Sequence, residues 1–152
     1  MNILGTRSTK WGSRFMCWGL GEPVSHVAVE LDNGFVVHAH LLGGLRIDWG
    51  RDFRRNNQVV IELGADNIPE RETVQALLDA HAGSGYDYWA FAYFGWRALL
   101  RKCFGIPFPR ENKWARRHAF LCTEWLSVLI FRQERAMITP YELLKELSDG
   151  RI

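Results

Sequence analysis

Cys122 is the residue of this chain whose sequence context best suits a nucleophile. It stands at the start of the apolar run 121–126, which predicts a helix that begins at the cysteine. A cysteine at the first residue of a helix lies in the positive end of the helix dipole, and this favours thiolate over thiol. A thiolate attacks amide and ester carbonyls when a neighbouring base takes up the thiol proton. We therefore expect covalent chemistry at Cys122 if the fold supplies a base.

Three histidines on two neighbouring segments are the candidate bases. His26 opens a stretch in which apolar residues alternate, and a second β-branched run after residues 32–34 carries His38 and His40. Two such runs around Asp-Asn-Gly predict a β-hairpin. A single histidine on a strand is usually a structural hydrogen-bonding residue, but three on one hairpin point to a site.

The turn of this hairpin decides whether the histidines share a face of the sheet. In a three-residue loop with Gly34 in the left-handed conformation, Ala28 pairs with His38 and His26 pairs with His40. All three imidazoles then lie on one face, where His26 can hydrogen-bond either of the others. A two-residue turn would shift the register by one residue and send His26 to the opposite face from His38. The sequence permits both turns.

The overall composition suits one compact domain over residues 1–152, because 47% of the residues are hydrophobic and the chain is long enough to bury a core. Lysine and arginine exceed aspartate and glutamate by 19 to 17, and the net charge of +2 does not point to nucleic acid. We expect no nucleic-acid partner.

The cysteines and the apolar windows bear on location. Cys17, Cys103 and Cys122 cannot all pair with one another, and their spacing is not that of a structural zinc site. Cys17 and Cys103 are expected to be packed thiols. The first residues lack the pattern of a secretory signal, and the most apolar window, 88–100, is too short to cross a bilayer. We therefore expect a cytoplasmic protein without a transmembrane segment.

Periodicity and capping signals predict an antiparallel sheet packed against helices, which is the α+β class. Strands are expected at 26–31, 35–41, 45–48 and 59–63, with a basic loop at 51–57 between the last two. Helices are expected from residue 11 to Gly19, at 69–83, at 86–104, from Cys122 to about Phe131, and from the Thr139-Pro140-Tyr141-Glu142 capping box to about Gly150.

The order of the motifs along the chain resembles that of a known family. The motifs are Ser25-His26-Val27-Ala28-Val29, Val36-Val37-His38-Ala39, Tyr86-Asp87 and Leu121-Cys122-Thr123-Glu124. They resemble the circularly permuted papain-like cysteine hydrolases of the NlpC type, the group that contains the YiiX-like amidases and lecithin retinol acyltransferase. In that group the histidine strand comes first and the nucleophile helix last. The resemblance covers most of the chain and includes residues 6–11 and 43–47.

The resemblance implies a permuted papain-like fold with Cys122 as nucleophile, His26 as general base and His38 as the residue that orients His26. His40 is an alternative orienting residue, and Tyr86 is a candidate contact for the substrate or the oxyanion. The expected reaction is hydrolysis of an amide or ester bond in a peptide, cell-wall or lipid substrate through a thioester, without cofactor or metal. Acyl transfer to a second acceptor is an open alternative.

The two branches of the family are not separated by these motifs. A histidine twelve positions after the first, as His38 is after His26, is similar to the acyltransferase branch. The Cys-Thr-Glu sequence at Cys122 is more similar to the YiiX-like branch. The substrate class therefore stays open.

Two other functions fit some of the same residues. His38-x-His40 together with His26 resembles a three-imidazole zinc site, with Cys122 as a fourth ligand. The alternative to both enzymes is a non-catalytic binding module on the same fold, which would use the aromatic segment 86–104 as its interface. Sensitivity to chelation separates the metal enzyme from the thiol enzyme.

Overall fold

A five-stranded antiparallel sheet is the centre of the fold. The computed structural model describes residues 1–40, 44–64, 75, 85–107, 109, 113–114, 119–120, 122–131 and 137–150. Its strand order is β4-β3-β2-β1-β5. The strands are β1 (Asn2–Arg7), β2 (His26–Glu30), β3 (Phe35–His40), β4 (Gly44–Trp49) and β5 (Gln58–Gly64).

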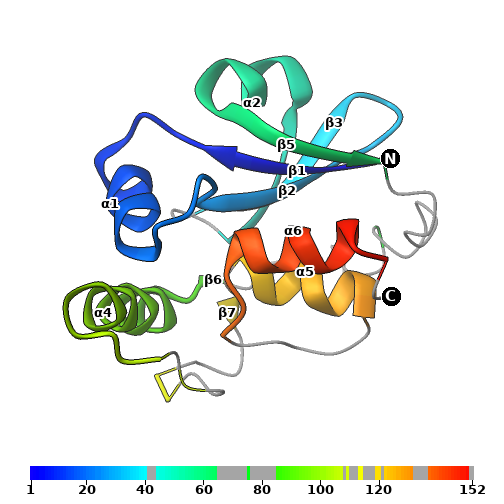
Figure 1. Cartoon of the computed structure of the whole chain (residues 1–152). Coiled ribbons are helices and arrows are strands. Elements are labelled where there is room, and N and C mark those ends of the chain that lie inside the picture. The colour runs from blue at the N-terminus through cyan, green and yellow to red at the C-terminus, as the bar shows by residue number, and fades with distance from the viewer. Residues whose placement is uncertain are drawn as a thin grey trace.

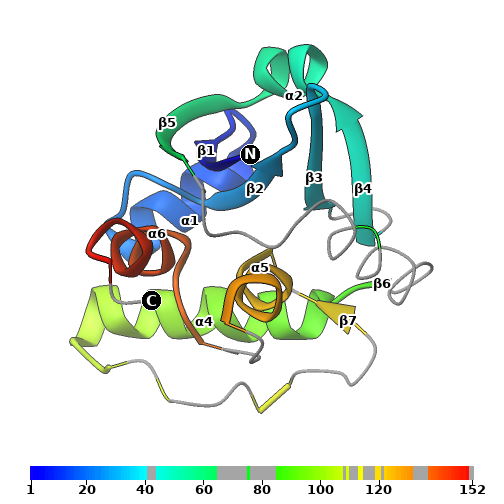
Figure 2. The same cartoon turned by 90° about the vertical axis from the view of Figure 1, so that its right-hand side faces the viewer.

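Helices cover both faces of this sheet, and two more pack beside it (Figure 1). Helix α2 (Gly50–Asn56) lies on one face, and α5 (Cys122–Phe131) and α6 (Pro140–Ser148) lie on the other. Helices α1 (Trp11–Leu20) and α4 (Tyr88–Phe104) pack against each other. The short strands β6 (Gly85–Tyr86) and β7 (Ala119–Phe120) form a parallel pair, and β7 ends just before α5 (Figure 2).

The central strands β2 and β3 are apolar on both faces. Val27 and Val37 pack in one core with Trp125 of α5. Ala28 and Val36 belong to a second core, on the α2 side, with Leu4 and Phe53. Because side chains alternate along a strand, these two cores identify which residues face α5 and which face α2.

Local signals explain where the helices begin and end. Asp87 caps α4, since its carboxylate accepts a 2.8 Å hydrogen bond from the backbone N–H of Ala90. Thr139 and Glu142 form a reciprocal capping box at the start of α6. Helix α1 ends where Gly21 adopts the left-handed conformation, with φ of 71°.

Most of the predicted strands and helices within the described residues are present, and one segment was predicted wrongly. The basic segment 51–57 is not a loop, because α2 spans most of it. Its single apolar residue, Phe53, is buried against the sheet, and its charges complement the dipole, with Asp52 in the first turn and Arg54 and Arg55 in the last. A helix this short shows too few apolar repeats to be recognised from periodicity.

Three short strands were not anticipated. In β1, consecutive residues such as Ile3 and Leu4 are both buried, so the strand lacks the alternation that marks a half-buried strand. Strands β6 and β7 have two residues each, too few for any pattern. The helix expected at 69–83 lies outside the described residues except for Gln75, which is helical.

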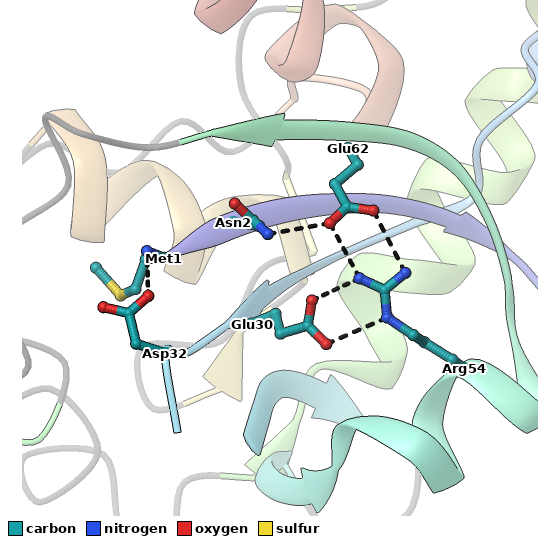
Figure 3. Close-up of polar contacts among 6 residues, drawn as sticks. All are labelled: Met1, Asn2, Glu30, Asp32, Arg54 and Glu62. Atoms are coloured by element: carbon teal, nitrogen blue, oxygen red, sulfur yellow. Dashed lines mark hydrogen bonds and ion pairs between the residues drawn. The ribbon is translucent and has the colours of Figure 1, made fainter. Parts of the chain in front are cut away.

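A network around Arg54 ties α2 to the sheet (Figure 3). The Arg54 guanidinium donates to both carboxylate oxygens of Glu30 on β2 and to both of Glu62 on β5. Asn2 on β1 donates to Glu62 as well. Arg54 lies between two carboxylates that would otherwise repel each other, and these hydrogen bonds raise the pKa of Arg54 further above its usual range.

We predict that Arg54→Met lowers the free energy of unfolding by about 1 kcal/mol, because Glu30 and Glu62 then lose their shared cation. Urea unfolding at neutral pH measures the effect. Arg55→Met is the matched control, since Arg55 is exposed on the same helix. Equal stability of the two variants would contradict a stabilising role for the network.

Candidate functional site

Of the two turns that the sequence permits, the three-residue loop is the one present, and it places the histidines on one face. Gly34 has φ of 81°, and the ladder of β2 and β3 pairs Ala28 with His38. The ladder does not continue to a pairing of His26 with His40. The rings of His26 and His38 nevertheless meet edge to face, with 5.4 Å between their centroids, and His40 lies 5.9 Å from His38.

His38 is held by a carboxylate on the neighbouring strand. Its Nε2 lies 3.0 Å from Oδ2 of Asp48 on β4. An ionised carboxylate only accepts hydrogen bonds, so the imidazole N–H is the donor. Burial lowers the pKa of His38, and the hydrogen bond and charge of Asp48 oppose that shift only in part. His38 is therefore a neutral imidazole oriented by Asp48.

His26 has no such partner. Its Nε2 is buried and has no hydrogen-bond partner among the described residues. Its ring packs near Phe53, with 6.5 Å between centroids. Burial first, and then the charges that His38 and His40 would carry, lower the pKa of His26 to about 3. At neutral pH His26 is thus an uncharged imidazole with an unused ring nitrogen.

These imidazoles line a cavity of about 650 Å³ on the α2 side of the sheet. Its walls come from α1, α2, β2, β3, β4 and one residue of α4, with neighbouring loop residues, and it contains hydroxyl, carboxylate, amide and aromatic groups. The residues that matter for chemistry are Ser13, Ser25, His26, His38, His40, Asp48 and Asp52. The Oγ atoms of Ser13 and Ser25 are hydrogen-bonded to each other. A cavity of this size with several convergent polar groups is suited to a small-molecule or peptide ligand.

Cys122 is the first residue of α5, as its sequence context predicted, and its side chain is buried. Burial is the main cause that raises the pKa of the thiol to about 11, and the charge of Glu124 adds to it. Hydrogen bonding by the backbone of Val27, Thr123 and Cys122 acts in the opposite direction. A hydrogen bond that lowers a thiol pKa is donated to the sulfur, so the sulfur lies beside the Val27 N–H.

The structure therefore brings the start of α5 to the start of β2 without joining the side chains of Cys122 and His26. Cys122 packs in the core on the α5 side, which includes Val27. His26 is the neighbour of Val27 in the chain, and its ring lies near Phe53 on the α2 side. Successive side chains of a strand point to opposite faces, so the sheet separates the sulfur from the imidazole. Cys122 does not line the 650 Å³ cavity.

The remaining sequence-predicted residues are placed as follows. Tyr86 is in β6 and pairs with Phe120, two residues before Cys122, so its backbone lies near the start of α5. His40 lines the cavity beside His38, and burial is the largest cause that lowers its pKa.

The described residues include no group of three or more His, Cys, Asp or Glu side chains placed to hold a metal ion. That finding does not favour the zinc alternative.

Asp48 is the site residue that sequence analysis missed. His38 pairs directly with Arg46 on β4, and Asp48 is two residues further on the same face. A diagonal neighbour of this kind is within reach of a long side chain. Residues 45–48 alternate between apolar and charged side chains, so Asp48 stood out as a polar residue of this strand. Its contact with His38 could be predicted only from the pairing register of β3 and β4.

Comparisons of the chain with known protein families, with curated proteins and with solved structures give no significant match. None of the helices in the described part of the chain has the length and apolar character needed to span a membrane.

We predict that His26 makes the folded state lose stability as the pH falls. Its pKa is about 3 in the folded protein and about 6.5 when unfolded, so below pH 6.5 only the unfolded chain takes up the proton. The contribution of His26 is complete above pH 6.5 and is lost progressively towards pH 3. His26→Asn should flatten this dependence, measured as the change in urea midpoint between pH 7.5 and pH 5. A midpoint change as large as that of the original chain would contradict the shift, and His40→Asn is the matched control.

Proposed function

We propose that this chain is a cysteine-dependent hydrolase with a permuted papain-like arrangement, in which Cys122 is the nucleophile and His26 the general base. The observation that carries the proposal is that Cys122, the first residue of α5, packs in the same core as Val27, the residue that follows His26. Two segments almost a hundred residues apart in sequence thus converge at the point where the family resemblance requires them to converge. His38 lies edge to face against His26, with 5.4 Å between ring centroids, and is itself held by Asp48, so it is the residue that would orient His26.

The chemistry follows from these groups. His26 takes the proton of Cys122, and the sulfur forms a bond to the carbonyl carbon of an amide or ester. The carbonyl electrons move to oxygen, where backbone N–H groups at the start of α5 stabilise the charge. When the oxyanion collapses, the bond to the leaving group breaks and the imidazolium protonates that group. Water then attacks the thioester with His26 again as base, and the acid is released.

A rearrangement of His26 has to precede the first step. With the pKa of His26 at about 3 and that of Cys122 at about 11, the ion pair of thiolate and imidazolium is strongly disfavoured in the described geometry. The Nε2 atom of His26 has no hydrogen bond to lose, and the β2–β3 ladder ends at Ala28. The strand is therefore held on only one side at His26, where Thr6 of β1 is its partner. Because the sheet lies between the ring and the sulfur, the backbone at His26 has to rearrange so that the side chain reaches the α5 side.

The substrate class proposed is a peptide, cell-wall or lipid amide or ester. The cavity supports a polar ligand with an apolar part, because hydroxyl and imidazole groups lie next to Phe53, Phe91 and Trp49 in its walls. The three cysteines are all free, which fits the reducing, cytoplasmic location expected from the sequence.

One observation favours a second candidate, a binding module without thiol chemistry. The cavity contains the imidazoles and Asp48 but not Cys122. In such a module the neutral imidazoles would hydrogen-bond a ligand, and Cys122 would be a packed core residue.

Mass spectrometry after incubation with an activated ester probe tests the proposal. We predict a single acyl adduct on Cys122, formed more slowly by a factor of about 10² or more in His26→Ala, because general-base catalysis contributes that much. Cys103→Ser is the matched control, since Cys103 is exposed and its removal should leave the Cys122 adduct unchanged.

Two outcomes would contradict the thiol mechanism. One is labelling confined to Cys17 and Cys103. The other is hydrolysis of the probe by Cys122→Ala at the original rate. If Cys122→Ala instead binds a ligand as tightly as the original chain and neither protein turns it over, the binding module is the better account.

A further inference from the structure

The outer faces of α1 and α4 carry several exposed aromatic side chains. Trp11 is 79% exposed, Trp18 is 53% exposed and Trp96 is 52% exposed. The ring of Phe15 lies between those of Trp11 and Trp18. It is stacked on Trp11, with 5.6 Å between centroids, and tilted relative to Trp18, at 6.0 Å. Indole rings in water are costly, and an exposed group of them marks an interaction surface.

This surface is continuous across the two helices. The residues Trp11 and Phe15 of α1 and Trp96 and Leu99 of α4 line one apolar groove of about 330 Å³. The helices can approach closely because they pack against each other through small residues, as Gly19 faces Ala98. Figure 1 shows α1 and α4 together at one side of the molecule, away from α2. We call Trp11, Phe15, Trp18, Trp96 and Leu99 the aromatic surface.

The charged residues that α1 and α4 themselves contain are all cations. Neither α1 nor α4 contains an aspartate or a glutamate, whereas the two helices contain Arg14, Arg97, Arg101 and Lys102. Arg14 is three residues after Trp11 and four before Trp18, so it borders the rings on the same side of α1. Arg101 lies 3.9 Å from Glu142, and Arg97 donates to the carbonyl of Pro107, so Arg14 and Lys102 are the better candidates to meet an anion.

Tryptophan side by side with cations, without anions, is the pattern that binds the interface of an anionic bilayer. Indole rings partition to the depth of the lipid headgroups, and lysine and arginine meet the phosphate and carboxylate charges there. A protein partner would be expected to meet a mixture of charges instead. We propose that the aromatic surface docks this protein on an anionic lipid bilayer.

This docking also places the cavity near the bilayer, since Gly12, Met16 and Phe91 line both the groove and the 650 Å³ cavity. The proposal does not depend on turnover at Cys122. It requires only that the outer faces of α1 and α4 contact lipid.

Vesicle flotation with the full chain tests the proposal, with vesicles of phosphatidylcholine alone and of phosphatidylcholine mixed with phosphatidylserine. Binding is expected only to the anionic vesicles and should weaken as salt is added. The double variant Trp11→Ala, Trp96→Ala should bind at least about tenfold more weakly. Its matched control is Val60→Ala, Tyr141→Ala, which removes two exposed side chains from β5 and α6, outside the 650 Å³ cavity, and should bind within about twofold of the original chain.

Charge reversal gives a second, independent arm. Arg14→Glu with Lys102→Glu should weaken binding to the anionic vesicles by about tenfold or more. The control, Arg51→Glu with Arg55→Glu, makes the same change in net charge on α2, away from the aromatic surface, and should have little effect on binding. Absence of binding to anionic vesicles would overturn the proposal. An equal loss of vesicle binding in either of the control variants would overturn it as well. Self-association that the Trp11→Ala, Trp96→Ala variant abolishes, without vesicle binding, would assign the surface to a second copy of the chain and also overturn it.

Discussion

The alternation of side chains along β2 is the constraint on which the candidate site depends. Val27 faces the core that contains Cys122, whereas His26 lines the cavity under α2 and Ala28 packs with Phe53 on that same side. A strand cannot change this alternation without a bulge, so the sulfur and the imidazole are neighbours through the backbone and not through space on one face. The proximity of the two segments and the separation of the two side chains have the same cause.

Burial then sets the electrostatic state on each side of the sheet. On the α5 side, the loss of water around Cys122 favours the thiol, and the N–H groups near the sulfur recover only part of the difference. On the α2 side, the loss of water around His26 favours the neutral ring. Both groups are therefore in their uncharged forms, and the proton transfer that we propose requires the backbone at His26 to rearrange first.

The sequence was informative about the hairpin and less so about which helix covers which face. Turn chemistry reduced the hairpin to two registers, and the structure has the one in which Gly34 ends a three-residue loop and Ala28 pairs with His38. The start of α5 at Cys122 and the capping of α6 by Thr139 were predictable from local signals in the same way. These features depend on residues close together in the chain.

The position of α5 relative to the histidines depends on long-range packing. Both faces of β2 and β3 are apolar, with Val27 and Val37 on one side and Ala28 and Val36 on the other, so neither face is marked in the sequence as the one that receives α5. The Asp48 partner of His38 needed the β3–β4 register, and the short helix α2 offered too few residues for a periodic pattern. Tertiary packing decided each of these points.

We propose that His26 is a neutral imidazole in the free protein, with no hydrogen-bond partner for Nε2 among the described residues, and that it becomes the partner of Cys122 only when the thiol reacts. NMR titration of the His26 ring carbons, in the free protein and after acylation of Cys122, measures this directly. We predict that the pKa of His26 lies far below 6.5 in the free protein and that acylation changes both this pKa and the environment of the ring. A free-state pKa near 6.5 that acylation leaves unaltered would contradict it.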